Sequence, residues 1–286
     1  MQELFPNLYI EQGYPGVVLG VITLPHGLVL IDAPFRPEDI RSWRAALVNL
    51  GGGVDRLLVN LDAHVDRTLG SRAMDCTVIA HEGVVAVLRN RPATLKAQGV
   101  ETGAEWELYE NLGSVRWSPP EITFTERMKI FWNEAPLVLE YHPGPSNGAI
   151  WVNVLEHKTV FVGDAVVYPQ PPFLAQANIP EWLRTLETLA SAEYRDYLII
   201  GGRTGLVTLK EVERQAEFLQ KVLTRLESLD TGSASPEVLI ANLARELLGE
   251  FEVLPERAAQ YENRLKHGLW RYYLRHYRSS EDTVED

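Results

Sequence analysis

Residues 56–67 read RLLVNLDAHVDR. The first five letters form a short apolar run of the kind that makes a buried β-strand. The last six place Asp62, His64, Asp66 and Arg67 in one short loop. The strand therefore places a group of ionisable side chains together in the loop at its C-terminal end.

Strand-like runs also precede this stretch. Residues 17–24 and 28–32 are rich in β-branched and aliphatic residues, and the turn PHG between them predicts a hairpin that ends at Asp32. A helix is expected to begin near Pro37 and to stop at the glycines of 51–53. Further elements are predicted as helices over 82–89, 101–111, 180–190 and 207–229, and as strands within 77–80, 122–163 and 197–200.

A small polar stretch at 229–235, LDTGSAS, reads as a linker. Two amphipathic helices are predicted after it, the first opening at Pro236 and the second at Pro255. We therefore expect a main domain over 1–230, a helical C-terminal extension over 234–280 and an acidic tail over 281–286.

The extension also carries a mixture of basic and aromatic residues. These are Arg264, Lys266, Arg271, Arg275 and Arg278, interleaved with Trp270, Tyr272, Tyr273 and Tyr277. Such helices can touch nucleic acid or anionic membrane. Packing on the main domain or on a second subunit accounts for them better in an acidic chain, and a homodimer through the C-terminal helices is one arrangement that this leaves open.

Composition and charge limit the function classes. The chain has 286 residues, which suits one large α/β domain with an appendage. It has 27 Lys and Arg against 39 Asp and Glu, a net charge of -12 that argues against a nucleic-acid partner. No apolar run approaches the roughly 20 residues that span a bilayer, so no membrane partner is expected. The single cysteine, Cys76, and the lack of a signal-like start predict a cytoplasmic protein.

Five landmarks occur in order along the chain. They are the hairpin ending at Asp32, the loop with His64 and Asp66 after a strand, PGPSNG at 143–148 before a strand, FVGD at 161–164, and IGGR at 200–203 before a long helix. Together they resemble the metallo-β-lactamase superfamily, in its glyoxalase-like branch, over about residues 7–229. The resemblance implies an α/β fold, a four-layer αββα sandwich with one or two metal ions at the sheet ends. It also implies that Asp32 supports the neighbouring loops.

The residues at the family's metal positions depart from its pattern. In that family the ligands are a His-x-His-x-Asp-His loop, a His after Pro-Gly, an Asp after Gly and a late His. Matched one by one, His64, Asp66 and Asp164 agree, whereas Asp62, Arg67, Pro145 and Arg203 stand where the family has histidines. An alternative alignment would recruit His142, one residue before Pro143, although the preceding strand would turn its side chain away from the pocket.

The two metal subsites implied by the resemblance therefore differ. At the second subsite Arg67 and Arg203 would join Asp66 and Asp164, and a guanidinium has no lone pair to give to a metal. The hypothesis is that an ion-pair network replaces the metal there. The first subsite would keep Asp62, His64 and Asp164, a set that suits one Zn, Mn or Fe ion provided that the shorter Asp62 reaches it. We thus expect no metal or one divalent metal, and not a dinuclear zinc centre.

Three functional hypotheses follow. The first is a hydrolase-like fold that has lost its dinuclear zinc site and acts as a pseudoenzyme or small-anion binder. Its anionic or zwitterionic ligand would meet Arg67 and Arg203, with Tyr168 in the pocket wall. The second is a mononuclear-metal hydrolase of ester, thioester, lactone or phosphoester bonds. There Asp66 would orient or deprotonate water, and Arg203 or Arg67 would stabilise the oxyanion. The third is a homodimeric interaction module with a vestigial pocket.

Overall fold

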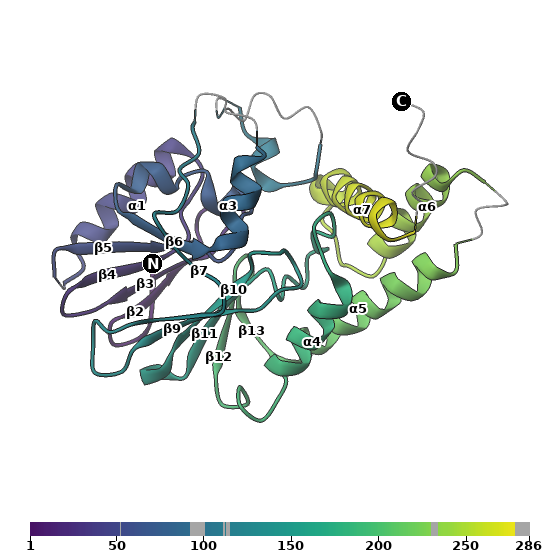
Figure 1. Ribbon diagram of the computed structural model, residues 1–286. Helices are drawn as coiled ribbons and strands as arrows, with labels where there is room; N and C mark the ends of the chain where they lie inside the picture. Colours follow the sequence, from purple (N-terminus) through teal and green to yellow (C-terminus); the bar gives the residue numbers. More distant parts are fainter. Residues whose placement is uncertain (52, 92–100, 111, 113–114, 230–233, 278–286) are drawn as a thin grey trace.

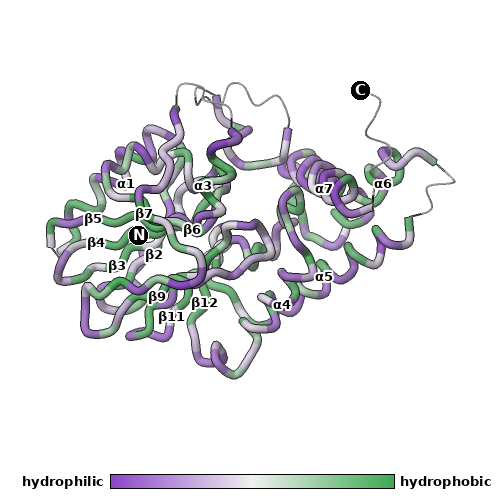
Figure 2. The backbone as a smooth tube through the Cα atoms, viewed as in Figure 1, coloured by the Kyte–Doolittle hydropathy of each residue, from purple (hydrophilic) through white to green (hydrophobic). Residues whose placement is uncertain are grey.

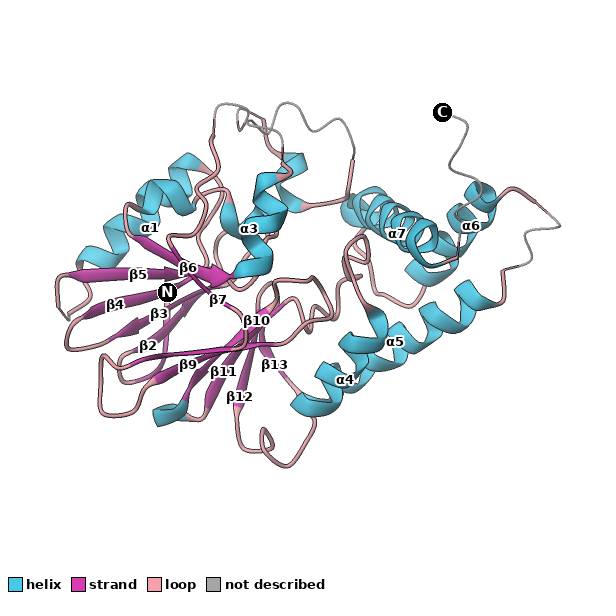
Figure 3. Ribbon diagram, in the orientation of Figure 1, coloured by secondary structure: helices cyan, strands magenta, loops and turns pink. Residues whose placement is uncertain are grey.

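The computed structural model describes residues 1–51, 53–91, 101–110, 112, 115–229 and 234–277. Two mixed β-sheets face each other and helices cover their outer sides (Figures 1 and 3). This is the expected αββα sandwich. The helical extension lies at one end of it, beside α4 (Ile179–Leu189) and α5 (Leu209–Glu227).

The first sheet has the strand order β1-β2-β3-β4-β5-β6-β7. Its strands are β1 (Gln2–Phe5), β2 (Leu8–Glu11), β3 (Leu19–Thr23), β4 (Gly27–Ile31), β5 (Asp55–Val59), β6 (Thr77–His81) and β7 (Ile122–Phe124). The predicted hairpin is the antiparallel pair β3–β4, and β4, β5, β6 and β7 run parallel. The parallel strands bring the loops after β4 and β5 to the same edge of the sheet.

The second sheet has the order β13-β12-β11-β10-β9-β8. Its strands are β8 (Arg127–Ile130), β9 (Leu137–Tyr141), β10 (Ile150–Val154), β11 (Thr159–Gly163), β12 (Leu198–Gly201) and β13 (Gly205–Val207). Only β11 and β12 pair in parallel within this sheet. Asp164 and Arg203 follow those two strands, so both reach the edge where the loop after β5 ends.

Alternation of side chains along β4 divides the core into layers, since successive residues of a strand face opposite sides. Val29 and Ile31 lie in the cluster between the sheets, with Phe161 of β11. Leu28 and Leu30 lie in the outer cluster, where they pack with Trp43 of α1 (Pro37–Val48). Figure 2 shows the strands of both sheets as mainly hydrophobic, as this double burial requires.

The remaining helices are α2 (Val65–Thr68), α3 (Glu82–Arg89), α6 (Pro236–Leu248) and α7 (Pro255–His276), and the 3-10 turns are η1 (Ser71–Met74), η3 (Glu105–Leu108) and η4 (Leu155–His157). Apolar residues of α6 and α7, among them Leu247 and Leu269, belong to the same buried cluster as Val160 of β11 and Val222 of α5. The extension and the main domain thus share one core. No helix among the described residues is long and apolar enough to cross a membrane.

One predicted helix is wrong. Within the described part of this stretch, residues 101–110, only the short turn η3 forms, because Gly103 has a left-handed φ of 69° and Ala104 is extended. Asp66 accepts hydrogen bonds from the N–H groups of Glu105, at 3.4 Å, and of Trp106, at 2.9 Å. The Glu107 side chain accepts from the N–H groups of Thr102 and Gly103. The centre of the predicted linker, 230–233, and the acidic tail lie outside the described residues.

Candidate functional site

The loop after β5 is held by short-range hydrogen bonds. Asp62 Oδ1 accepts the N–H of His64 at 2.7 Å, and His64 is the N-cap of α2. The Asn60 side chain donates to the carbonyl oxygen of Arg67 at 3.1 Å. Asp32, at the end of β4, accepts the N–H of Leu61 at 3.0 Å. Asp32 therefore supports the loop, as the sequence led us to expect. These hydrogen bonds hold the ionisable residues of the loop close to one another and to Asp32.

Arg67 lies at the centre of a buried ion-pair network. Its side chain is 0% exposed, and Nη1 lies 2.8 Å from Asp32 Oδ2. Nη2 donates to Asp164 Oδ1, and Nε lies 3.0 Å from Asp62 Oδ1 without the alignment of a hydrogen bond. Gly202 leaves room for this guanidinium, since a Cβ there would lie 2.6 Å from Nη1. One guanidinium is therefore shared by three carboxylates.

Arg203, after β12, completes the network from the second sheet. Its side chain is 2% exposed, and its Nη1 donates to Asp66 Oδ2 at 2.8 Å. Nε donates to both oxygens of Asp164, at 3.0 and 3.1 Å. Nη2 lies 2.8 Å from His64 Nδ1. Because a guanidinium can only donate, His64 Nδ1 accepts and the imidazole is the neutral tautomer with its proton on Nε2.

The network shifts the pKa values of its members in opposite directions. Burial alone would raise the pKa of Asp164, but Arg203 and Arg67 lower it far below its usual range. Burial raises the pKa of Asp32 to about 6 in spite of Arg67, and burial likewise raises the pKa of Asp62. Burial and then Arg203 lower the pKa of His64 well below its usual range. His64 is therefore uncharged at neutral pH, in agreement with its hydrogen bonding.

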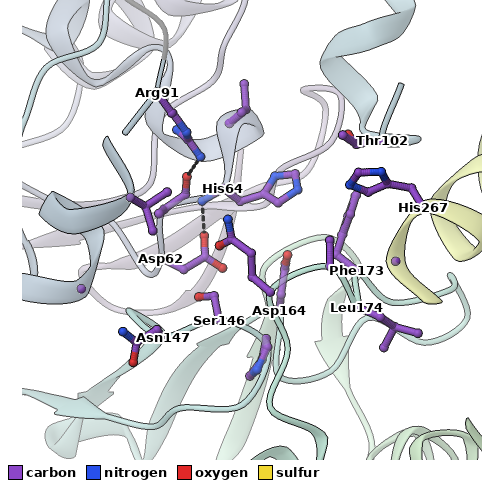
Figure 4. A pocket seen from close by; sticks show the side chains of 18 of the residues that line it. Asp62, His64, Arg91, Thr102, Ser146, Asn147, Asp164, Phe173, Leu174 and His267 are labelled. Carbon is purple, nitrogen blue, oxygen red and sulfur yellow. Dashed lines mark hydrogen bonds between the residues drawn. The ribbon is translucent and has the colours of Figure 1, made fainter. Parts of the chain in front are cut away.

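A cavity of about 520 Å³ opens in front of this network (Figure 4). Asp62, His64 and Asp164 form part of its wall. Its other lining residues come from α2, from α3 and the two residues after it, from the strap (residues 101–110, which contain η3), from the loops 145–147 and 173–176, and from α7. They include Val65, Ala86, Val87, Arg91, Thr102, Trp106, Phe173, Leu174, Arg264 and His267. In the view of Figure 4, Arg91 and His267 lie on opposite sides, with His64 between them.

The expected ligand-binding residues are placed differently from the prediction. Arg67 and Arg203 do not line the cavity, because both lie behind the carboxylates that they bind. Tyr168 is also not in the cavity wall. Its hydroxyl accepts a hydrogen bond from Arg214, and its ring lies 6.2 Å from that of Phe251 in a separate hollow beside α5. His142, the alternative metal ligand, stacks on Trp151 with ring centroids 3.7 Å apart.

Sequence reasoning missed the strap that connects the network to α7. The carboxylate of Asp66 holds the amides of η3, and the Glu105 side chain accepts from Arg257 at 2.7 Å and from Gln260 at 3.2 Å. Further along α7, Arg264 Nε donates to the carbonyl oxygen of Gly103 at 3.0 Å. The basic residues of this helix were the only sequence signal, and they were expected to pack rather than to build a cavity wall.

The donors present do not fit a metal ion at the family's positions. Asp164 accepts from both guanidiniums, and Asp62 Oδ1 already accepts the His64 amide. His64 Nδ1 is engaged by Arg203. Across the described parts of the chain, no group of three or more His, Cys, Asp or Glu side chains is arranged to hold a metal. A cation at this place would also lie next to two fixed positive charges.

Comparisons with known proteins agree with this fold. Residues 63–201 match the family model of the metallo-beta-lactamase superfamily. The solved structures similar to this chain include a metallo-beta-lactamase from Pontibacter korlensis, with a TM-score of 0.61 and 15% identity over 77% of this chain and 97% of that one. A metallo-beta-lactamase family protein from Thermus thermophilus has a TM-score of 0.62 and 22% identity over 96% of this chain and 94% of that one.

The stereoselective inverting sec-alkylsulfatase from Pseudomonas sp. has a TM-score of 0.65 and 15% identity, covering 99% of this chain and 51% of that one. Coverage of 96% or more cannot be reached without α6 and α7, so the extension is part of the similarity to the Thermus and Pseudomonas structures. No curated protein matches the chain. At these identities the likeness is one of fold, and the activity has to be argued from the site.

Proposed function

Starting from a chain that carries a metallo-beta-lactamase superfamily domain, we propose that an arginine–carboxylate network has replaced the metal centre and that the protein binds a small molecule in the adjoining cavity. The observation that carries this proposal is the position of the two guanidiniums. Arg67 and Arg203 meet on Asp164, the residue that matches the family's bridging carboxylate.

Charge explains why the network can stand in for a metal. A cluster of buried carboxylates needs positive charge close by, since an uncompensated buried charge costs several kcal/mol. Two guanidiniums supply two positive charges, and their planar forks reach several carboxylates at once. Arg67 contacts three carboxylates and Arg203 contacts two. The site thus keeps its acidic residues without coordination chemistry.

The mononuclear hydrolase is less well supported. It needs Asp62, His64 and Asp164 to turn lone pairs towards one ion, and each of these residues already accepts a hydrogen bond within the network. Its water-activating residue, Asp66, is held by Arg203 and by two amides of η3 and is 0% exposed. We therefore favour a binding protein over a metal-dependent hydrolase.

Metal content tests the proposal directly. The protein would be purified without a metal-chelating tag and its metal measured by elemental analysis. We expect a clearly substoichiometric amount and a melting temperature that added zinc and manganese leave unchanged, because only a ligand that binds the folded state stabilises it. About one equivalent of tightly held metal would contradict the proposal.

A double substitution sharpens this test. Arg67→His together with Arg203→His restores imidazoles at two positions where the family has histidines. We expect zinc to raise the melting temperature of this variant and not that of the unmodified protein. Arg225→His, which changes an exposed arginine paired with Glu246, is the matched control. If zinc does not stabilise the double variant, the two arginines do not occupy the metal positions.

A further inference from the structure

Arg264 of α7 is a buried cation without an anionic partner. The residue is 1% exposed, yet no carboxylate of the described residues lies within 4.0 Å of its guanidinium. Its hydrogen bonds go to neutral oxygens, from Nε to Gly103 O and from Nη1 to Pro171 O at 3.1 Å and Gln170 Oε1 at 3.4 Å. The guanidinium also lies over the ring of Phe173, 4.1 Å from its centroid. Buried charges are normally paired, so this arrangement needs an explanation.

The free part of Arg264 is accessible from the cavity. Nη2 makes no hydrogen bond to the described residues, and it is not among the atoms sealed from solvent. Arg264 is a lining residue of the cavity. A molecule in the cavity can therefore reach the one nitrogen of this side chain that the protein leaves unused.

A second guanidinium lines the same cavity. Arg91 donates to the carbonyl oxygen of Ala63 and, at 3.4 Å, to the Thr68 hydroxyl, and it lies over the Trp117 ring at 4.5 Å. Like Arg264, it forms no ion pair within the described residues. Burial lowers the pKa of Arg91 to about 10, and burial followed by the nearby Arg203 lowers that of Arg264 to about 10. Both positive charges are under-compensated in the free protein.

The rest of the cavity is mainly apolar. Val65, Val87, Trp106 and Leu174 line it, and Ala86 on α3 lies at its exposed side. A volume of about 520 Å³ lies within the range of small-molecule sites. An apolar wall combined with a few cationic groups is typical of a site for a molecule with a hydrophobic body and one charged end.

The residues of the cavity wall also indicate the sign and the number of charges on the polar end of the ligand. The guanidinium of Arg264 calls for an anion, and a guanidinium pairs well with a carboxylate. Asp62 and Asp164 also line the cavity, and their carboxylates would repel a doubly charged head such as a phosphate more strongly than a single charge. A monoanion satisfies both conditions.

We propose that the cavity binds an amphipathic monocarboxylate, with its carboxylate on Arg264 Nη2 and its hydrocarbon part against Val65, Val87 and Leu174. The inference rests on the proposed function, because it assigns a ligand class to the same cavity. It corrects the earlier expectation as to which arginines meet the ligand. Arg67 and Arg203 pair with Asp62 and Asp164 from behind the cavity wall, and Arg264 is the group that the ligand contacts.

The probes are octanoate, octylamine and octyl phosphate, titrated calorimetrically into the full chain in the presence of EDTA. We expect octanoate to bind, octyl phosphate to bind more weakly and octylamine not to bind. Arg264→Met should weaken octanoate binding about tenfold or more, the loss expected for a charged hydrogen bond. Arg264→Lys should recover part of that loss, because it restores the charge without the fork.

Two further variants make the result interpretable. Arg275→Met is the matched control, because Arg275 lies on the same helix and also donates to a carbonyl oxygen, that of Ala177 at 3.0 Å, but does not line the cavity. It should leave octanoate affinity unchanged. Ala86→Trp fills the cavity from an exposed helical position and should abolish binding without unfolding the protein. It gives a decisive readout even if Arg264→Met does not fold.

The outcomes separate this inference from the proposed function. No octanoate binding by the unmodified protein, equal affinity for octylamine, or unchanged affinity in both Arg264→Met and Ala86→Trp would overturn the monocarboxylate assignment. None of these results bears on the metal content. Binding that appears only after zinc is added and EDTA omitted would instead contradict the proposed metal-free function.

Discussion

Replacing Arg67 by methionine is the most direct test of the network's part in stability. Methionine keeps an unbranched aliphatic side chain in place of that of arginine and lacks the guanidinium. Three carboxylates then lose a contact, those of Asp32, Asp62 and Asp164, whose side chains are 0%, 4% and 6% exposed. Removing one partner of a buried ion pair costs about 3–5 kcal/mol, because the other charge stays buried without compensation. We expect a loss of that size in the free energy of unfolding at pH 8.

The loss should shrink as the pH falls. Burial already raises the pKa of Asp32 to about 6 in the presence of Arg67, and it raises that of Asp62. Without Arg67 both pKa values rise further, so between pH 8 and pH 5.5 the folded variant binds protons that the unfolded chain does not bind. Stability then increases as the pH decreases. Since one unit of pKa corresponds to about 1.4 kcal/mol, the deficit should fall by about 1–2 kcal/mol over this interval.

Urea unfolding followed by tryptophan fluorescence at both pH values measures the effect. Arg245→Met is the control, because Arg245 is 61% exposed and lies 3.5 Å from Glu262 in a solvent-facing pair. It should change stability by no more than about 0.5 kcal/mol. A loss below about 1 kcal/mol for Arg67→Met at pH 8, or a deficit that grows on acidification, would show that Arg67 does not compensate the buried carboxylates.

Two further substitutions and one deletion test neighbouring parts of the structure. Gly202→Ala places a Cβ 2.6 Å from Arg67 Nη1, and the guanidinium cannot easily move away because several carboxylates hold it. The substitution should lower the free energy of unfolding by about 1–3 kcal/mol, measured by thermal unfolding. An unchanged melting temperature would contradict this. Trp182→Phe removes the 2.8 Å hydrogen bond from Nε1 to Ala165 O and leaves a void in the core, so urea unfolding should show a loss of about 1–3 kcal/mol. Deletion of residues 234–286 exposes the core that α6 and α7 share with α5 and should give aggregation in size-exclusion chromatography rather than a soluble monomer.

Local patterns predict most of the strands and the acidic loop, whereas the sandwich was implied by the resemblance to the metallo-β-lactamase superfamily. Strand β5 ends at Val59, and Asp62, His64 and Asp66 lie within the next seven residues, so their common location follows from chain connectivity. Asp164 and Arg203 each follow a strand in the same way. The ion-pair partners of Arg67 could not be predicted from the sequence. Its contact with Asp32 crosses from one strand end to another, and no sequence spacing specifies which carboxylate a long side chain will choose.

The cavity wall could not be predicted for a related reason. Arg91, Phe173 and Arg264 are distant in sequence, and only the folded chain brings them to one surface. The predicted helix at 101–111 failed because of packing that the sequence does not show. Gly103 has a left-handed φ of 69° where it lies against α7, since a Cβ there would be 2.4 Å from the Gln260 carbonyl oxygen, and the chain is not helical at this point. A sequence pattern does not show which glycine adopts such a conformation.

The strap and Phe173 also connect the C-terminal extension to the ion-pair network of Arg67 and Arg203. Phe173 has the guanidinium of Arg203 4.6 Å from its ring centroid and that of Arg264 at 4.1 Å, so one ring contacts both the buried network and the cavity cation. Asp66 is joined to α7 through Glu105 and its bonds to Arg257 and Gln260. A displacement of Arg203 from the network would disturb Phe173 and Asp66, and through them the position of α7. The ion-pair network therefore also helps to fix the cavity wall that carries Arg264.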